Sequence, residues 1–193
     1  QFVIAFYGTL LAGGVGVNVN PLYTPRELRH QLADAGAETL VILDHLLPRY
    51  LEVEKEVPVK RVVVTGIKDF LPFPKNLLYP LKAKRDGLPL GFPKREGFHA
   101  FAELLKRPPA EPHVPDPEDL ALLQYTGGTT GLSKGAMLTH KNLVANVLQI
   151  DALDPTSKDL VGKGVMLGAL PFFHVYGMTV AMNLALLGGA KLV

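Results

Sequence analysis

Apolar residues in this chain gather in short runs separated by turn residues, and the runs are of two alternating kinds. Runs rich in valine, leucine and isoleucine predict buried strands. We place these strands at 15–19, 39–43, 59–64, 120–124, 164–170 and 190–193. Segments of good helix formers predict helices at 2–12, 25–35, 45–56, 143–150 and 179–187. This alternation indicates the α/β class, with a largely parallel sheet flanked by helices.

Single positions add detail to three of the predicted helices. The helix at 2–12 is apolar all round, which is typical of a deeply buried helix. Thr24, with a proline next and Glu27 three positions later, has the pattern of a capping box. Thr139 is predicted to cap the helix that follows it. The apolar face of that helix is then Leu143, Val144, Val147 and Leu148.

The alternation is interrupted by an excursion at residues 69–117, which holds 10 of the 16 prolines. Between Lys75 and Arg107 there are 8 Lys or Arg and 3 Asp or Glu, so this stretch carries +5. Apolar residues are interleaved with the cations. One interpretation is a solvated excursion in which lysine stems cover apolar surface. The other is a face that rests on anionic lipid.

Composition narrows the possible classes of protein. With 193 residues, 48% hydrophobic and 20% charged, the chain is expected to be globular and large enough for one domain. The net charge of +2 is too small to indicate nucleic acid, and we expect no such partner. The absence of cysteine excludes disulfides, a thiolate nucleophile and cysteine-ligated zinc. It is consistent with a cytoplasmic location, which the lipid hypothesis extends to peripheral contact with the inner face of the membrane.

Two long stretches without charge, 1–25 and 165–190, are interrupted by Asn, Pro, His or Gly. Each therefore falls short of the roughly 20 unbroken apolar residues that a membrane-spanning helix needs. The chain opens at Gln1 on an apolar run and stops at Val193 inside a predicted strand. We expect it to be a piece of a longer protein.

The stretch between the strand at 120–124 and the helix at 143–150 reads YTGGTTGLSKGAMLTH over residues 125–140. Its glycines leave backbone N–H groups accessible, its hydroxyls add donors, and Lys134 adds a positive charge. A flexible surface turn is the simpler interpretation. The strand before, the lysine within and the helix after favour a polyphosphate site. It is not a Walker loop, because Lys134 follows Ser133 and precedes a glycine.

This loop closely resembles the phosphate loop of the adenylate-forming superfamily, which holds acyl-CoA synthetases, luciferases and peptide-synthetase adenylation domains. Ser133 stands where that family usually has proline. The resemblance implies an ATP-phosphate cradle, with Mg²⁺ reached by Thr126 or Thr129. The residues carried over to the cradle are Thr126, Gly127, Gly128, Thr129, Thr130, Gly131, Ser133 and Lys134.

A second motif, LPFFHVYG at 170–177, follows the strand at 164–170. Open α/β sheets bind ligands at this end of a strand, although a lone histidine among aromatic residues is more often a core residue. In the superfamily this position lines the acyl pocket near the reacting carboxylate. The resemblance therefore makes His174 a candidate beside the carboxylate, with no residue assigned as catalytic with certainty. The acyl-binding candidates are His174, Val175, Gly177 and Met178.

The resemblance spans nearly the whole chain and is closest to bacterial long-chain fatty acyl-CoA synthetases. It implies that residues 1–193 are part of the large N-terminal, AMP-binding domain, with the excursion at 69–117 inside it. Such enzymes convert a fatty acid and ATP into an acyl-adenylate and pyrophosphate, and then transfer the acyl group to coenzyme A. The family's adenine loop, magnesium-binding glutamate, catalytic lysine and C-terminal domain would lie beyond Val193. We therefore expect the chain alone to be inactive.

Two other functions stay open on sequence grounds. The first is an adenylating ligase for another carboxylate, such as an aryl, short-chain or amino acid. The second is a non-catalytic, membrane-associated nucleotide-binding module that uses the basic stretch as its anchor. The other five histidines show no metal-binding spacing. A homo-oligomer is compatible with the sequence, which does not indicate the number of subunits.

Overall fold

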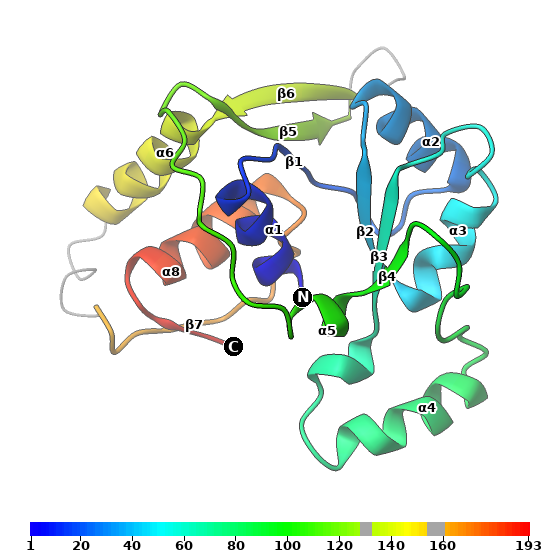
Figure 1. The fold of residues 1–193 in the computed structure, drawn as a ribbon. Coiled ribbons are helices and arrows are strands. Elements are labelled where there is room, and N and C mark those ends of the chain that lie inside the picture. Colours follow the sequence, from blue (N-terminus) through cyan, green and yellow to red (C-terminus); the bar gives the residue numbers. More distant parts are fainter. Residues whose placement is uncertain (128–132, 154–160) are drawn as a thin grey trace. The chain divides into compact units, whose positions relative to one another are not determined.

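The computed structural model describes residues 1–127, 133–153 and 161–193 (Figure 1). The chain divides into two compact units. The first comprises Gln1 and Pro21–Glu111, and the second comprises Phe2–Asn20 and Pro112–Val193. No helix in the described ranges is long and apolar enough to cross a membrane.

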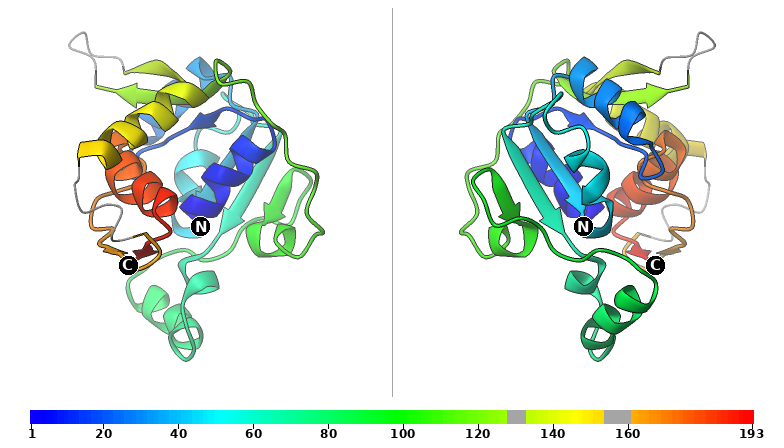
Figure 2. Two further views of the ribbon diagram at one scale, coloured as in Figure 1. Left: turned by 90° about the vertical axis from the view of Figure 1, so that its left-hand side faces the viewer. Right: turned by 90° about the vertical axis from the view of Figure 1, so that its right-hand side faces the viewer.

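The first unit is built on a parallel sheet of three strands in the order β2-β3-β4. Its elements in chain order are α2 (Pro25–Asp34), β2 (Thr39–Leu43), η1 (Asp44–Leu46), α3 (Leu47–Leu51), β3 (Arg61–Thr65), η2 (Ile67–Phe70), α4 (Lys75–Arg85), β4 (Phe98–Ala100) and α5 (Phe101–Leu104). Helices α2 and α3 lie beside β2 and β3 (Figures 1 and 2). The core of this unit includes Leu28, Leu32, Leu40, Leu47, Tyr50, Val62 and Val64.

The start of α2 and the bounds of β2 confirm what the local sequence predicts. Thr24 Oγ1 accepts a hydrogen bond from the backbone N–H of Glu27, and the Glu27 carboxylate accepts one from the backbone N–H of Thr24. This capping box satisfies donors that a helix start leaves unpaired. The helix is followed by Gly36, whose φ of +58° suits a residue without a side chain.

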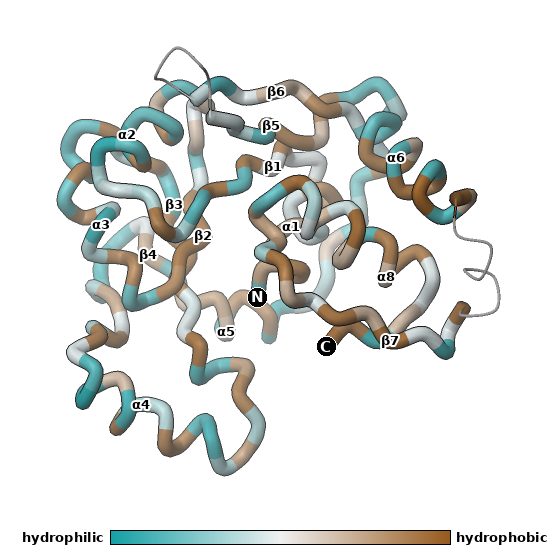
Figure 3. Tube along the Cα trace, turned by 180° about the vertical axis from the view of Figure 1, so that it is seen from behind, coloured by the Kyte–Doolittle hydropathy of each residue, from teal (hydrophilic) through white to brown (hydrophobic). Residues whose placement is uncertain are grey.

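The excursion contains more regular structure than its prolines suggest. It forms α4, whose hydrophilic and hydrophobic positions alternate along the tube in Figure 3, and it adds β4 to the sheet. Val62 pairs with Phe98 in the parallel register. The guanidinium of Arg95 lies 4.6 Å from the centre of the Phe98 ring and pairs with Glu54. The sequence did not predict β4, because three residues are too few to show a period.

The second unit holds two small sheets with helices packed against them. Its elements are α1 (Phe2–Leu11), β1 (Gly16–Val17), β5 (Leu120–Thr126), β6 (Lys134–Thr139), α6 (His140–Leu153), β7 (Val165–Met166), the π-helix η3 (Gly177–Asn183), α8 (Leu184–Leu187) and β8 (Lys191–Leu192). Strand β5 lies between β1, which is parallel to it, and β6, which is antiparallel. Strands β7 and β8 pair in parallel.

The α/β class with parallel strands and flanking helices is confirmed, but the strands are shared among three sheets. Strand β1 pairs with β5 and not with β2, its neighbour in the sequence. Strand β6 was missed, because its residues were assigned to the loop. The segment 164–170 contributes a strand only at Val165–Met166.

The core of the second unit is formed by Phe6, Leu10, Ala121, Leu122, Met178 and Met182. Two expectations about buried faces were wrong within the described residues. Helix α1 is not buried all round, because Ile4 and Leu11 are exposed. Helix α6 buries Val147, whereas Val144 and Leu148 are exposed and line an apolar groove with α1 and α8. The apolar face of α6 is wider than the surface on which it packs.

Candidate functional site

The predicted phosphate loop is the connection of a β-hairpin, not of a strand and a helix. Strands β5 and β6 pair antiparallel up to Thr126, which lies opposite Lys134. Directly opposite residues of paired strands point to the same face. The exposed Thr126 hydroxyl and the exposed Lys134 ammonium group therefore leave the hairpin on one side, at the base of the loop. Lys134 begins β6 instead of lying within the loop.

Four predicted cradle residues, Gly128, Thr129, Thr130 and Gly131, lie outside the described residues. Gly127 is exposed, and a Cβ added there would have no neighbour within 4 Å. Gly127 is not among the described glycines with positive φ, so a special backbone conformation does not explain it. What the glycine provides is a backbone that no side chain covers. Ser133 is half-buried at the other side of the loop.

Close packing of Tyr125 on Gly135 holds the base of the hairpin. These two residues face each other across the strands, and Tyr125 is buried. A Cβ added to Gly135 would lie 3.0 Å from Cε2 of the tyrosine ring. The glycine is therefore required for its small size, which lets the ring lie over the partner strand.

A buried amide joins the hairpin to the second motif. Gln124 Nε2 donates a hydrogen bond to the carbonyl oxygen of Phe173 at 3.3 Å, and Gln124 Oε1 accepts one from Asn18 Nδ2 at 3.2 Å. Residues 170–177 therefore lie at the end of β5, close to the base of the loop. Sequence reasoning missed this role of Gln124. Its signal was a polar residue inside an otherwise apolar strand.

His174 is exposed at the turn before the π-helix η3. Its Nδ1 accepts a hydrogen bond from the backbone N–H of Tyr176 at 3.2 Å. In the neutral imidazole the proton is then on Nε2, which can donate to an oxygen of a ligand. Val175 is also exposed, whereas Met178 is fully buried in the core. Of the predicted acyl-binding side chains, the structure therefore exposes His174 and Val175.

Gly177 makes the turn at the second motif possible. A Cβ at this position would lie 2.4 Å from the carbonyl oxygen of Pro171, which is closer than atoms can approach. The backbone N–H of His174 donates to the same oxygen at 3.1 Å. The position of His174 therefore depends on a glycine three residues later. A π-helix starts at this glycine, and π-helical turns are frequent at functional sites.

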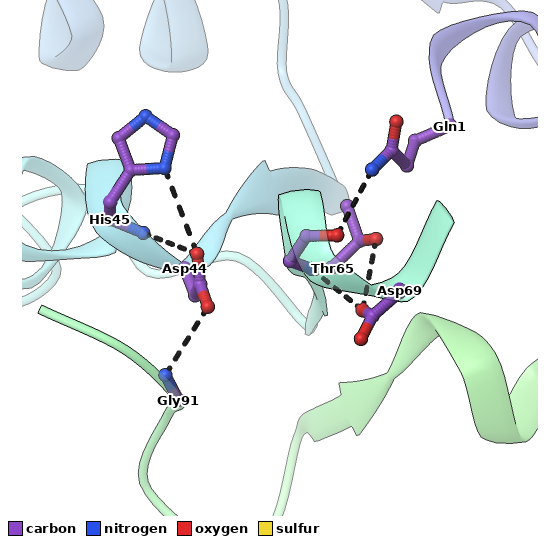
Figure 4. Close-up of polar contacts among 7 residues, drawn as sticks. Gln1, Asp44, His45, Thr65, Asp69 and Gly91 are labelled. Atoms are coloured by element: carbon purple, nitrogen blue, oxygen red, sulfur yellow. Dashed lines mark hydrogen bonds and ion pairs between the residues drawn. The ribbon is translucent and has the colours of Figure 1, made fainter. Parts of the chain in front are cut away.

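In the first unit, polar residues that follow β2 and β3 form a cluster of hydrogen bonds (Figure 4). The sequence did not predict this cluster. Asp44 is buried and accepts hydrogen bonds from the backbone N–H groups of His45 at 2.8 Å and Gly91 at 3.4 Å. Asp69 accepts one from the backbone N–H of Gly66 at 2.7 Å, and Gln1 Nε2 donates to the Gly66 carbonyl oxygen. These carboxylates are hydrogen-bonded to the protein itself. The cluster is therefore a structural anchor of the excursion.

The donors that could hold a metal ion are few in the part of the chain that the structure describes. No group of three or more His, Cys, Asp or Glu side chains comes together there in a metal-binding arrangement. The Thr126 hydroxyl is an oxygen ligand of the kind that Mg²⁺ accepts. It is exposed beside Lys134.

The sequence model of the AMP-binding enzyme family matches residues 1–193. The chain belongs to this family. The resemblance inferred from the loop is thereby confirmed. The match to the family model includes every described helix and strand and the excursion at 69–117.

Curated relatives of this AMP-binding enzyme chain include long-chain-fatty-acid–CoA ligases from Bacillus subtilis (strain 168) and Escherichia coli O157:H7. They are 43% and 40% identical over 197 and 202 residues, and each alignment covers 100% of this chain and 35% of the relative. A 4-coumarate–CoA ligase from Narcissus pseudonarcissus is 33% identical over 199 residues, covering 100% of this chain and 31% of that protein. The chain spans about a third of the length of these relatives.

Among solved structures, a long-chain-fatty-acid–CoA ligase (FadD1) from Archaeoglobus fulgidus is similar with a TM-score of 0.68 and 30% identity. The match covers 100% of this chain and 32% of that one. ATP-bound MatB from Rhodopseudomonas palustris matches with a TM-score of 0.67 and 26% identity, covering 99% and 32%. The fold of this chain is thus found in larger enzymes of which one was crystallised with ATP.

Proposed function

We propose that the whole protein containing this chain is an ATP-dependent long-chain fatty acid–CoA ligase. The observation that carries the proposal is the exposed pair Thr126 and Lys134 at the base of the hairpin loop, next to the turn that presents His174. Support for the substrate class comes from the identity of 43% to the Bacillus subtilis ligase. The residues of this chain would bind the ATP phosphates and the reacting carboxylate.

The reaction proceeds in two steps that place different charges near these residues. In the first, a carboxylate oxygen bonds to the α-phosphorus of ATP and the bond to the pyrophosphate oxygen breaks. In the second, the sulfur of coenzyme A bonds to the acyl carbon, AMP leaves, and the thiol proton is released. Negative charge accumulates on the pyrophosphate in the first step. A fixed cation and N–H donors lower that barrier, because they are already oriented toward the charge.

Four residues of this chain contact the substrates in this proposal. Lys134 neutralises the β- and γ-phosphates from the start of β6, and the Thr126 hydroxyl donates to a phosphate oxygen or ligates Mg²⁺. A bound Mg²⁺ would supply further charge neutralisation. His174, with Nδ1 held by the Tyr176 N–H, donates from Nε2 to the carboxylate. The exposed Val175 contributes apolar surface for the acyl chain.

The test is carboxylate-dependent exchange of radiolabelled pyrophosphate into ATP, measured on the whole protein with palmitate. We expect Lys134→Met to lower the exchange rate by about 100-fold, the usual order for one lost charge-stabilising group. Lys141→Met is the matched control, because Lys141 is exposed in the same unit and pairs with Glu118 away from the loop. Equal rates for both variants would contradict the proposed role of Lys134.

An adenylating ligase for another carboxylate is the second candidate, and the identity of 33% to a 4-coumarate–CoA ligase favours it. Exchange measured with palmitate, butyrate, 4-coumarate and amino acids separates the two. Binding of ATP without exchange for any carboxylate would instead favour a non-catalytic nucleotide-binding module. The 193-residue chain alone is expected to form no acyl-adenylate.

A further inference from the structure

Helix α4 has a buried side that already accounts for its packing within the first unit. Ala83 is fully buried, and Asn76, Tyr79 and Pro80 are partly buried. Successive residues of a helix are separated by about 100° around the axis, so these four positions lie on one side. The rest of the helix surface is not needed for this contact.

The opposite side of α4 carries leucines that face solvent. Leu77, Leu78 and Leu81 are 64%, 58% and 69% exposed, and Phe73 just before the helix is 78% exposed. By helical spacing the three leucines form one stripe, centred opposite Ala83. Single exposed leucines are ordinary, but a contiguous apolar stripe marks a surface that contacts something else.

Cations flank this stripe on both sides. Around the helix axis, Lys84 falls next to Leu77, while Lys75 and Lys82 fall on the side of Leu78. Within the described residues, no ion pair is made by Lys75, Lys82 or Lys84, and all three are exposed. Arg85 falls within the arc of the stripe at its C-terminal end, between Leu81 and Leu78 around the axis, and pairs with Asp86. An apolar stripe with lysines on both sides is the pattern of a helix that lies in a lipid interface.

We propose that the outer face of α4 docks on an anionic lipid bilayer. Phe73 and the three leucines enter the boundary between headgroups and acyl chains, and the flanking lysines contact lipid phosphates. Charge complementarity favours this occupant, since the stretch from Lys75 to Arg107 carries +5 while the whole chain carries +2. The proposal is independent of the ligase reaction, because it uses no residue of the hairpin or of the second motif.

Vesicle binding by the whole protein tests the charged part of this face. Co-sedimentation is measured with phosphatidylcholine vesicles and with vesicles in which about a third of the lipid is phosphatidylglycerol. Each cation near such a surface contributes roughly fivefold in binding, so Lys82→Glu/Lys84→Glu should weaken binding to anionic vesicles by at least about 20-fold. Arg26→Glu/Lys55→Glu is the matched control, since it changes the net charge equally at exposed sites outside α4.

The apolar part of the face has its own variant. Leu77→Ser/Leu81→Ser should lower binding by about 10-fold or more, because two partly inserted leucines are lost. Leu105→Ser, at an exposed leucine of the same unit outside α4, should bind like the natural protein. Thermal unfolding of all variants shows that the fold is retained, which the exposure of these side chains predicts.

A fluorescent label separates lipid from other occupants. This chain has no cysteine, so in a whole protein whose cysteines outside this chain are replaced, Leu81→Cys carries a polarity-sensitive dye at one known position. We expect a blue shift when anionic vesicles are added and none with phosphatidylcholine alone. A dye that is shielded before any vesicle is added would show that another part of the protein or a second copy covers α4. That result, or binding that is independent of phosphatidylglycerol or unchanged in the α4 variants, overturns the proposal.

Discussion

The polar side chains at the ends of strands have different partners in the two units of this chain. After β2 and β3, the carboxylates of Asp44 and Asp69 accept hydrogen bonds from nearby backbone N–H groups. At the end of β5, the buried amide of Gln124 is used for support, while Thr126 and Lys134 remain exposed. Polar residues at a sheet edge therefore do not by themselves indicate a ligand site. What distinguishes the end of β5 is that the Thr126 hydroxyl and the Lys134 ammonium group remain accessible to solvent.

The largest expected effect comes from filling the turn that presents His174. Gly177→Ala places a methyl group against the carbonyl oxygen of Pro171, so the turn must open. We expect a loss of about 3 kcal/mol in the free energy of unfolding, at the upper end for overpacking. Chemical denaturation measures it.

Gly8→Ala is the control for this substitution, because a Cβ on Gly8 in α1 meets nothing within 4 Å. It should stabilise the protein by about 1 kcal/mol, since alanine is the better helix former. A Gly177→Ala protein as stable as the natural one would show that the turn tolerates a side chain.

Next in size is the removal of the anchor in the first unit. Asp44→Ala leaves the backbone N–H groups of His45 and Gly91 without the acceptor that the buried Asp44 carboxylate supplies. We expect a loss of about 2 kcal/mol, together with faster proteolysis around Gly91. Asp86→Ala, at an exposed carboxylate, should cost less than about 0.5 kcal/mol. Equal losses in the two variants would argue against an anchoring role for Asp44.

The corresponding group of the second unit is Gln124. Gln124→Leu keeps the volume but removes the hydrogen bonds to Phe173 and Asn18, and we expect a loss of about 1 kcal/mol. The bond to Phe173 positions the turn before His174. We therefore expect the rate of pyrophosphate exchange by the whole protein to fall even under conditions in which the variant stays fully folded. Combining it with Asn18→Ala in a double-mutant cycle should give a coupling energy above about 0.5 kcal/mol. Additive effects would contradict a shared network.

The smallest expected effect lies at the start of α2, far in sequence from both strand ends. Thr24→Ala should cost about 1 kcal/mol or less. Hydrogen bonds from the Thr24 backbone and hydroxyl lower the pKa of the Glu27 carboxyl. The stability that Glu27 contributes is therefore present above its unfolded pKa and is lost as pH falls through the lowered folded pKa. Glu27→Gln should remove this part of the pH dependence, which unfolding at several pH values measures.

Local signals predicted the parts of the fold that depend on neighbours in the sequence. The capping box at Thr24, the strand at Thr39–Leu43 and the cap at Thr139 are found where expected. Each rests on contacts within a few residues. The β5 prediction ended at residue 124, two residues before the observed end at Thr126.

The errors concern pairings between distant segments. The partner of β1 is β5, more than a hundred residues away, and two residues cannot show which sheet they will join. Strand β6 begins at Lys134 and contains Gly135, so its composition is that of a turn. Its pairing with β5 overrides that local preference. Likewise, Val144 and Leu148 line a groove with α1 and α8, which are distant in the sequence, so the sequence of α6 alone could not show their exposure.

The rung between Thr126 and Lys134 has a consequence for how such loops can change. An antiparallel rung holds its two Cα atoms about 5 Å apart, whatever sequence lies between them. The strand pairing therefore fixes the distance between the two ends of the connecting segment. Insertions or deletions in 127–133 would change the length of the segment and leave that distance unchanged. The chemistry of the segment can thus diversify without disturbing the core underneath.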